Sequence, residues 1–391
     1  MSSIVIQGDT SGSITVEAPS VAGTHTLTLP KATGNIATDA TVGLGTKNLI
    51  INGDMKIAQR GTSTTGITGN GYHTVDRWYS EITTAGTWTQ TQDTDVPLGQ
   101  GFATSLKMQC TTADASLGAG DLVNVTQRIE GQNLQHLKKG TANAESLTLS
   151  FWVKSNKTGT YIIELDDNDN GRNINQSYTI NSADTWEKKI LTFSGDTTGA
   201  LDNDNNHSFR VYFWLAAGSV FSSGTLQTSW GSTVNANRVV GNVNLADSTS
   251  NYINITAVQL EVGENATPFE HRPYDMELAK CQRYYIKFVS DGTIHEGYFG
   301  MGYYNSTVNL YCTVSLPVPM RESPILSYSA LSDLDLEPFD VAPSSVTYVA
   351  CDGNFAQVQV YAVDPAARTK GFAGQLKADV TNGYIDLDAE L

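Results

Sequence analysis

Short runs of alternating apolar and polar residues constrain the fold of this chain more than any other feature. The run LTLSFWVKS at 147–155 is typical, because its alternation places Phe151 and Val153 on one face of a strand and Trp152 and Lys154 on the other. Turns rich in Gly, Asn and Asp separate this run from similar ones at 105–110, 123–129, 159–165, 186–193, 208–215 and 251–260. The pattern predicts an antiparallel β-sandwich.

The composition also fits a chain of many short strands. Only 16% of the 391 residues are charged, against about 25% in an average soluble protein. Thr, Ser, Asn and Gly fill the difference, and these residues suit strands joined by polar turns. A chain of this length exceeds one ordinary hydrophobic core. We therefore expect an all-β protein with an N-terminal β arm and linker at 1–45, the sandwich at 46–274, and a linking helix with a smaller β domain at 275–391.

The first 45 residues form a distinct arm. Three short alternating runs, at 4–6, 13–16 and 26–29, are separated by Gly- and Pro-containing turns. So short a piece buries too little apolar surface to fold alone. We expect it to pair with copies of itself or with another protein.

One segment predicts a helix. In RPYDMELAKCQRYY, at 272–285, the helical pattern begins after Pro273, and Asp275 is a possible N-cap. Further strand-like runs follow it at 283–289, 297–304, 308–314, 346–349 and 355–363.

The charges argue against two classes of partner. The net charge is −16 and the basic residues are not clustered, whereas binding to a phosphate backbone or an anionic membrane needs clustered Lys and Arg. No apolar run approaches the roughly 20 residues of a membrane span, and the first ten residues lack the features of a secretory signal peptide. We expect no nucleic-acid partner, no membrane insertion, and synthesis in a cytoplasm without a signal peptide.

The four cysteines, Cys110, Cys281, Cys312 and Cys351, are widely spaced and form no CxxC pair. This spacing argues against a zinc site and favours buried free thiols.

Several motifs, taken in order, resemble a known family. NLIINGDMKIAQRGTS, YHTVDRWY, VTQRIEG, LTLSFWVKSNKTGTY, WEKKILTFSGDTTG and VQLEVGENATPFEHRPYDMELAKCQRYY are similar to tail fibre and appendage proteins of tailed bacteriophages, which carry a carbohydrate-binding-module-like jelly roll. The segment GDTSGSITVEAPSVAGTHTLTLP resembles the start of many phage structural proteins. The resemblance covers residues 1 to about 285 and leaves 286–391 outside.

The resemblance implies a structural virion protein. On it the chain is a homotrimeric tail fibre or spike subunit on the outside of the virion, which takes part in host attachment and reaches the exterior by lysis of the host. Residues 1–45 attach to other virion proteins, the sandwich at 46–274 is a jelly roll, and the C-terminal domain is distal and open to host surface polysaccharide. A capsid-attached head fibre or decoration protein without receptor binding is the alternative, and a polysaccharide depolymerase is a second.

One local motif could hold a metal. Asp166, Asn168 and Asn170, followed by Gly171, match the start of a calcium loop, D-x-[DN]-x-[DN]-G. The twelfth position is Ser177 instead of the usual Glu, and a strand precedes the motif. A structural calcium ion at this loop is one interpretation, and an acidic β-turn without a metal is the other; we expect no further cofactor.

Aromatic residues suggest carbohydrate contacts, because sugars stack on exposed rings. Trp230 lies in a polar loop-like segment, and Tyr303 and Tyr304 lie in the aromatic-rich C-terminal part. Packing in a core is the alternative for each tyrosine. The acid pairs of a glycoside hydrolase and the motifs HExxH, GxSxG and GxxxxGK are not recognisable in the sequence, so we expect no enzymatic activity.

Overall fold

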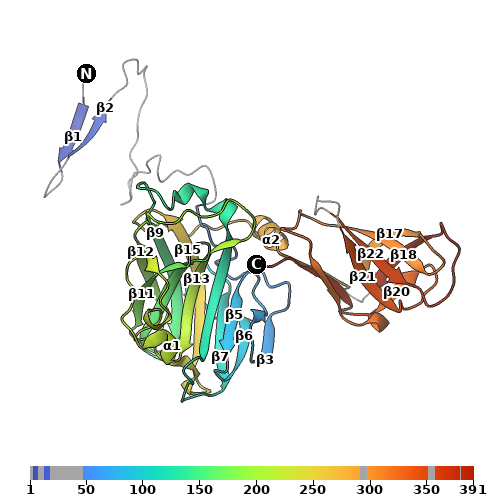
Figure 1. The fold of residues 1–391 in the computed structure, drawn as a ribbon, viewed down its shortest axis with the longest axis horizontal. Coiled ribbons are helices and arrows are strands. Elements are labelled where there is room, and N and C mark those ends of the chain that lie inside the picture. The colour runs from blue at the N-terminus through green and yellow to red at the C-terminus, as the bar shows by residue number, and fades with distance from the viewer. Residues whose placement is uncertain (1–2, 8–12, 18–46, 291–296, 351–356, 379) are drawn as a thin grey trace. The chain divides into compact units, whose positions relative to one another are not determined.

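A computed structural model describes residues 3–7, 13–17, 47–290, 297–350, 357–378 and 380–391 (Figure 1). It confirms the all-β class. The chain divides into two compact units, Met1–Gly45 and Thr46–Leu391. In the first, β1 (Ser3–Gln7) and β2 (Ser13–Glu17) form an antiparallel pair with Val5 opposite Thr15. The third run expected in the arm, at 26–29, lies outside the described residues.

The sandwich is made of two antiparallel sheets. The first has seven strands in the order β14 (Gly231–Ser232), β11 (Arg172–Ile180), β10 (Gly159–Asp167), β13 (His207–Ala217), β8 (Leu122–Glu130), β5 (Tyr79–Thr83) and β4 (Gly71–Tyr72). The second has six strands in the order β12 (Glu187–Phe193), β9 (Leu147–Ser155), β15 (Tyr252–Val262), β7 (Ser105–Thr112), β6 (Thr87–Asp93) and β3 (Ser63–Ile67).

The main core lies between these sheets. Phe151 on β9 and Phe213 on β13 are both fully buried, and their ring centroids are 5.1 Å apart in an edge-on arrangement. Val153 is also fully buried, whereas Trp152 and Lys154 are partly exposed, as the alternation predicts. Trp78 and Trp88 join the same core.

The C-terminal part has a second core of its own. Its larger sheet has the order β20 (Leu334–Glu337), β23 (Ala373–Ala378), β17 (Gly297–Tyr304), β18 (Asn309–Ser315), β22 (Gln357–Val363) and β21 (Ser345–Ala350). A smaller sheet has the order β16 (Tyr285–Val289), β24 (Tyr384–Asp388) and β19 (Ile325–Tyr328). Because the structure keeps 46–391 in one compact unit, the expected boundary between 274 and 275 stays a prediction.

Within the described residues, two α-helices interrupt the strands, α1 (Ser219–Ser222) and α2 (Tyr274–Gln282). The helix expected at 272–285 is therefore present. Its N-cap is Pro273, and Asp275 lies inside the first turn. The positive end of the helix dipole stabilises a carboxylate at this position. Cys110, Cys281 and Cys312 are buried free thiols, and burial raises the pKa of Cys312 to about 12.

Buried ion pairs join the sandwich to residues after α2. Arg77, which is 1% exposed, pairs with Glu390, and its guanidinium carbon lies 3.4 Å from the ring centroid of Tyr284. The buried carboxylate of Glu130, at the end of β8, accepts two hydrogen bonds of 2.8 Å from Arg283 and one from the Tyr284 hydroxyl. Burial alone would raise the pKa of Glu130, but the hydrogen bonds from Arg283 and Tyr284 outweigh it and lower the pKa.

This network predicts a large loss of stability on removal of one charge. The change Arg77→Leu should lower the free energy of unfolding by about 3 kcal/mol, because it removes the buried partner of the Glu390 carboxylate and leaves only Arg60, at 3.5 Å. Lys138→Met is the control, since Lys138 and Glu145 form an exposed pair at 2.6 Å and such a pair contributes about 1 kcal/mol or less. Urea unfolding of both variants measures the difference. Equal losses in the two variants would contradict the assignment.

Candidate functional site

A groove of about 540 Å³ lies on the outer face of the larger C-terminal sheet. Strands β17, β23 and β20 build it, and its lining residues are Tyr298, Met301, Gly302, Tyr303, Glu337, Pro338, Ala373, Gly374 and Gln375. The volume is within the range of about 300–1,000 Å³ typical of ligand pockets.

Small residues form the floor of this groove. Gly302 on β17 pairs with Gly374 on β23. A Cβ atom at Gly302 would overlap the carbonyl oxygen of Tyr311 on β18, and one at Gly374 would lie 2.7 Å from a methyl carbon of Leu310. Glycine is therefore required at Gly302, where the clash is with backbone, whereas at Gly374 the Cβ atom would meet the Leu310 side chain of the second core. Both contacts lie away from the groove, which the backbone of these two glycines lines.

Exposed apolar side chains form one wall. Tyr298, Met301 and Tyr303 on β17 are 56%, 66% and 51% exposed. The register of β17 against β23 shifts between Tyr298 and Gly300, and such a bulge changes which residues point outward. Tyr298 therefore shares the outer face with Met301 and Tyr303. In a regular strand, residues 298 and 303 would point to opposite faces, because an odd number of positions separates them.

Polar side chains form the opposite wall. Gln375 lies between Met301 on β17 and Glu337 on β20 in the strand register. Glu337 accepts a hydrogen bond of 2.5 Å from Lys377, whose side chain is 1% exposed. Pro338 continues this wall after Glu337. Tyrosine rings facing amide and carboxylate groups can stack on a sugar ring and bond its hydroxyls.

Of the two adjacent tyrosines expected to contact carbohydrate, only Tyr303 lines the groove. Tyr304 is fully buried in the second core, and its hydroxyl donates to Asp364 at 2.8 Å. Burial and then the carboxylate of Asp364 raise the pKa of Tyr304. The expectation for Tyr304 is corrected, because neighbouring strand residues face opposite sides and this one faces inward.

Trp230 is half-buried and packs against the sandwich core. Its indole N–H donates to the carbonyl of Ser194 at 2.7 Å, and the ammonium of Lys139 lies 5.3 Å from its ring centroid. The cavity beside it has a volume of only about 10 Å³. Its ring and its donor are thus engaged within the protein.

The expected calcium loop is the turn between β10 and β11, with Gly171 at φ +59°. Arg210 on β13 donates to Asp166 at 2.9 Å and to Asn168 at 3.2 Å. The amide of Asn170 donates to Asp167. The Arg210 guanidinium therefore bonds side-chain oxygens of Asp166 and Asn168, and Asn170 is held by its bond to Asp167, which corrects the metal-ligand expectation for these residues. In the described part of the chain, no group of three His, Cys, Asp or Glu side chains could hold a metal.

This arrangement predicts that calcium has no effect on stability. The thermal unfolding midpoint should be the same in EDTA and in millimolar calcium, because Arg210 already neutralises Asp166. The change Arg210→Ala should lower the midpoint, since it leaves a nearly buried carboxylate without its partner. A calcium-dependent rise in the midpoint of the unchanged protein would restore the metal interpretation.

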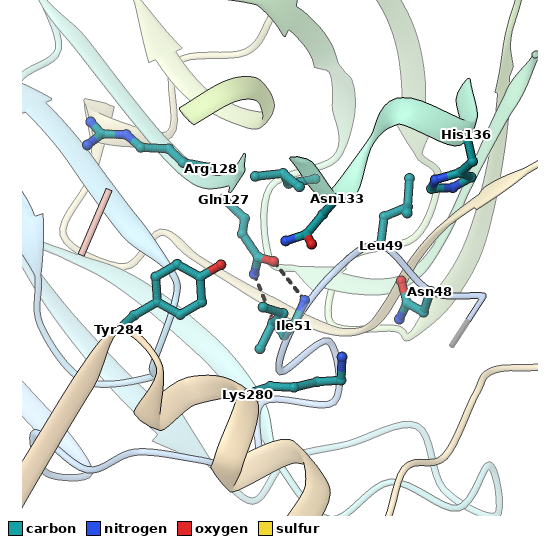
Figure 2. A pocket seen from close by; sticks show the side chains of 10 residues that line it. Asn48, Leu49, Ile51, Gln127, Arg128, Asn133, His136, Lys280 and Tyr284 are labelled. Atoms are coloured by element: carbon teal, nitrogen blue, oxygen red, sulfur yellow. Dashed lines mark hydrogen bonds between the residues drawn. The ribbon is translucent and has the colours of Figure 1, made fainter. Parts of the chain in front are cut away.

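A second, smaller cavity of about 170 Å³ lies where the segment 48–51, the end of β8 and helix α2 meet (Figure 2). Gln127 exchanges two hydrogen bonds of 2.8 Å with the backbone of Ile51 and so fixes this segment. Burial and the charge of Arg272 lower the pKa of Lys280 on α2. The cavity is smaller than typical ligand pockets. The side-chain amide of Gln127, which lines it, is already hydrogen-bonded to the backbone.

The outer face of the seven-stranded sheet is covered by the chain itself. Phe221, Leu226 and Val239 pack on the outward Trp214. Arg238 and the Trp214 indole N–H both bond the buried carboxylate of Glu164, at 2.9 and 2.8 Å. The aromatic residues of this face are therefore core residues of a third cluster, a result that strand alternation alone did not predict.

No family model and no curated protein matches this chain. Structural neighbours include a phage tailspike domain and carbohydrate-binding modules. The enzymatically active domain of tailspike protein 4 of bacteriophage CBA120 has 17% identity and a TM-score of 0.30 over 55% of this chain, and the match spans 21% of the tailspike chain.

Some of the neighbouring modules were solved with sugars. TmCBM61 in complex with β-1,4-galactotriose has 8% identity and a TM-score of 0.29, over 56% of this chain and 99% of that one. The family 11 module of Clostridium thermocellum, in complex with a β-1,3-1,4-mixed-linked tetrasaccharide, has 10% identity and a TM-score of 0.27, over 54% and 98%. Likenesses with such TM-scores do not establish a shared ligand. Among the described residues, no helix is long and apolar enough to cross a membrane.

Proposed function

We propose that this chain is a structural subunit of a bacteriophage virion fibre or spike, and that its C-terminal groove binds glycans of the host surface. The observation that carries the binding role is the groove on β17, β23 and β20, where two exposed tyrosines face Gln375 and Glu337. Exposed apolar patches rimmed by polar residues often mark ligand-binding grooves on soluble proteins.

The virion role is supported by the sequence motifs. They resemble tail fibre and appendage proteins in order over residues 1 to about 285. The arm at 1–45 adds a second argument, because a two-stranded sheet is at best marginally stable by itself and gains stability by joining other chains. On this proposal the subunit is a homotrimer, and its arm contacts other virion proteins.

The proposed groove binds sugar without cleaving it. Glycoside hydrolysis uses two carboxyl groups that flank the scissile bond. Glu337 is the one carboxylate among the nine residues that line the groove, and it is bonded to Lys377. The alternatives differ in a measurable way: a decoration protein would bind no glycan, and a depolymerase would release oligosaccharides from host polysaccharide.

A tyrosine substitution tests the binding role. The change Tyr303→Ala should weaken binding of host surface polysaccharide about tenfold, because a stacked ring contributes up to about 1.5 kcal/mol. Tyr274→Ala is the matched control, since Tyr274 is 60% exposed on α2 and lies outside the groove. Isothermal titration of the full chain and both variants gives the affinities. Equal weakening by both substitutions, or none by Tyr303→Ala, would count against the groove.

Deleting residues 1–45 tests the virion role. The truncated chain should keep both main hydrophobic cores, which lie within 50–389, and unfold cooperatively. It should no longer be incorporated into particles, as measured by immunoblotting of purified virions. Normal incorporation of the truncated chain would show that the arm is not the anchor.

A further inference from the structure

Negative charge lies at and beside one wall of the groove. Glu337, which lines the groove, and Asp340, three residues further along the chain, lie 2.5 and 3.5 Å from the ammonium of Lys377. Lys377 is almost fully buried, whereas the Asp340 side chain is 74% exposed. The carboxylates of Glu337 and Asp340 outnumber the one ammonium that they share, so this side of the groove carries negative charge, in a chain whose net charge is −16.

The cation of a further hollow does not reverse this sign. That hollow is lined by Phe339, Phe372 and Arg368, among others, and Phe339 and Phe372 are next in sequence to Pro338 and Ala373 of the groove. The guanidinium of Arg368 bonds Asp364 at 2.7 Å and lies 4.0 Å from the ring centroid of Phe339. Its charge is therefore balanced by its own carboxylate partner.

The groove is also long. Tyr298 and Tyr303 lie five residues apart on β17, a separation of roughly 16 Å along an extended strand. Two rings so far apart cannot stack on one sugar ring. They suit a linear chain of several sugars that lies along β17, with its hydroxyls facing Gln375 and Glu337.

We propose, on the basis of the proposed function, that this groove selects uncharged linear oligosaccharides and discriminates against those that carry carboxylates, such as uronic or sialic acids. The hydroxyls of a neutral sugar can donate to Glu337, whereas a carboxylate on the ligand would meet a like charge. The discrimination resides in Glu337 and Asp340, and the affinity resides in the tyrosines.

An array of neutral oligosaccharides, with carboxylated counterparts of the same linkage, tests this with the full chain. For a backbone that binds, the carboxylated form should bind about fivefold more weakly at low salt, and the ratio should shrink at 0.5 M NaCl because the charges are screened. Asp340→Asn should reduce the ratio without unfolding the chain, since this side chain is exposed. Glu337→Gln should reduce it further. Asp275→Asn, on exposed α2, is the control of equal charge change and should leave the ratio unaltered.

The outcomes separate the two claims. If neutral and carboxylated forms bind equally, or the carboxylated form binds better, the inference is wrong and glycan binding stands. If a preference exists but Asp340→Asn and Glu337→Gln leave it unchanged, these charges do not cause it and the inference is also wrong. If no glycan is retained at all, the proposed binding function fails and the inference fails with it.

Discussion

The side-chain carboxylates of Glu130 and Glu390 are buried, and each can remain there only because arginine side chains accompany it. Glu130 is held by Arg283 and Tyr284, and Glu390 by Arg77 and Arg60. Burial of a charge costs several kcal/mol unless such partners are present. These pairs connect residues of the sandwich with residues that precede and follow the C-terminal strands, so that charge pairs link the two main cores of the unit 46–391.

Because the cores account for most of the aromatic residues, the location of the remaining ones indicates function. Trp214 is covered by Phe221 and Val239, and Trp230 is bonded to Ser194. Tyr298 and Tyr303 are the exposed members of an aromatic-rich sheet, and they stand beside a floor made of Gly302 and Gly374.

The sequence predicts the all-β class, most sandwich strands and α2, because alternation and turn residues are local signals. It could not distinguish Tyr303 from Tyr304 as a surface residue, because a bulge earlier in β17 sets which side faces out. Nor could it show that Arg210, some 40 residues after Asp166, would occupy the calcium-like turn. The groove itself depends on the order β20, β23, β17, which brings together segments distant in the sequence. Such pairings are long-range and leave no local pattern.

A crystal structure of the full chain with a bound neutral oligosaccharide tests the central claim most directly. The account predicts a linear sugar chain along β17, with one ring stacked on Tyr303 and hydroxyls bonded to Gln375 or Glu337. A sugar seated instead on the sandwich, for example against Trp152 or Trp186, would contradict it.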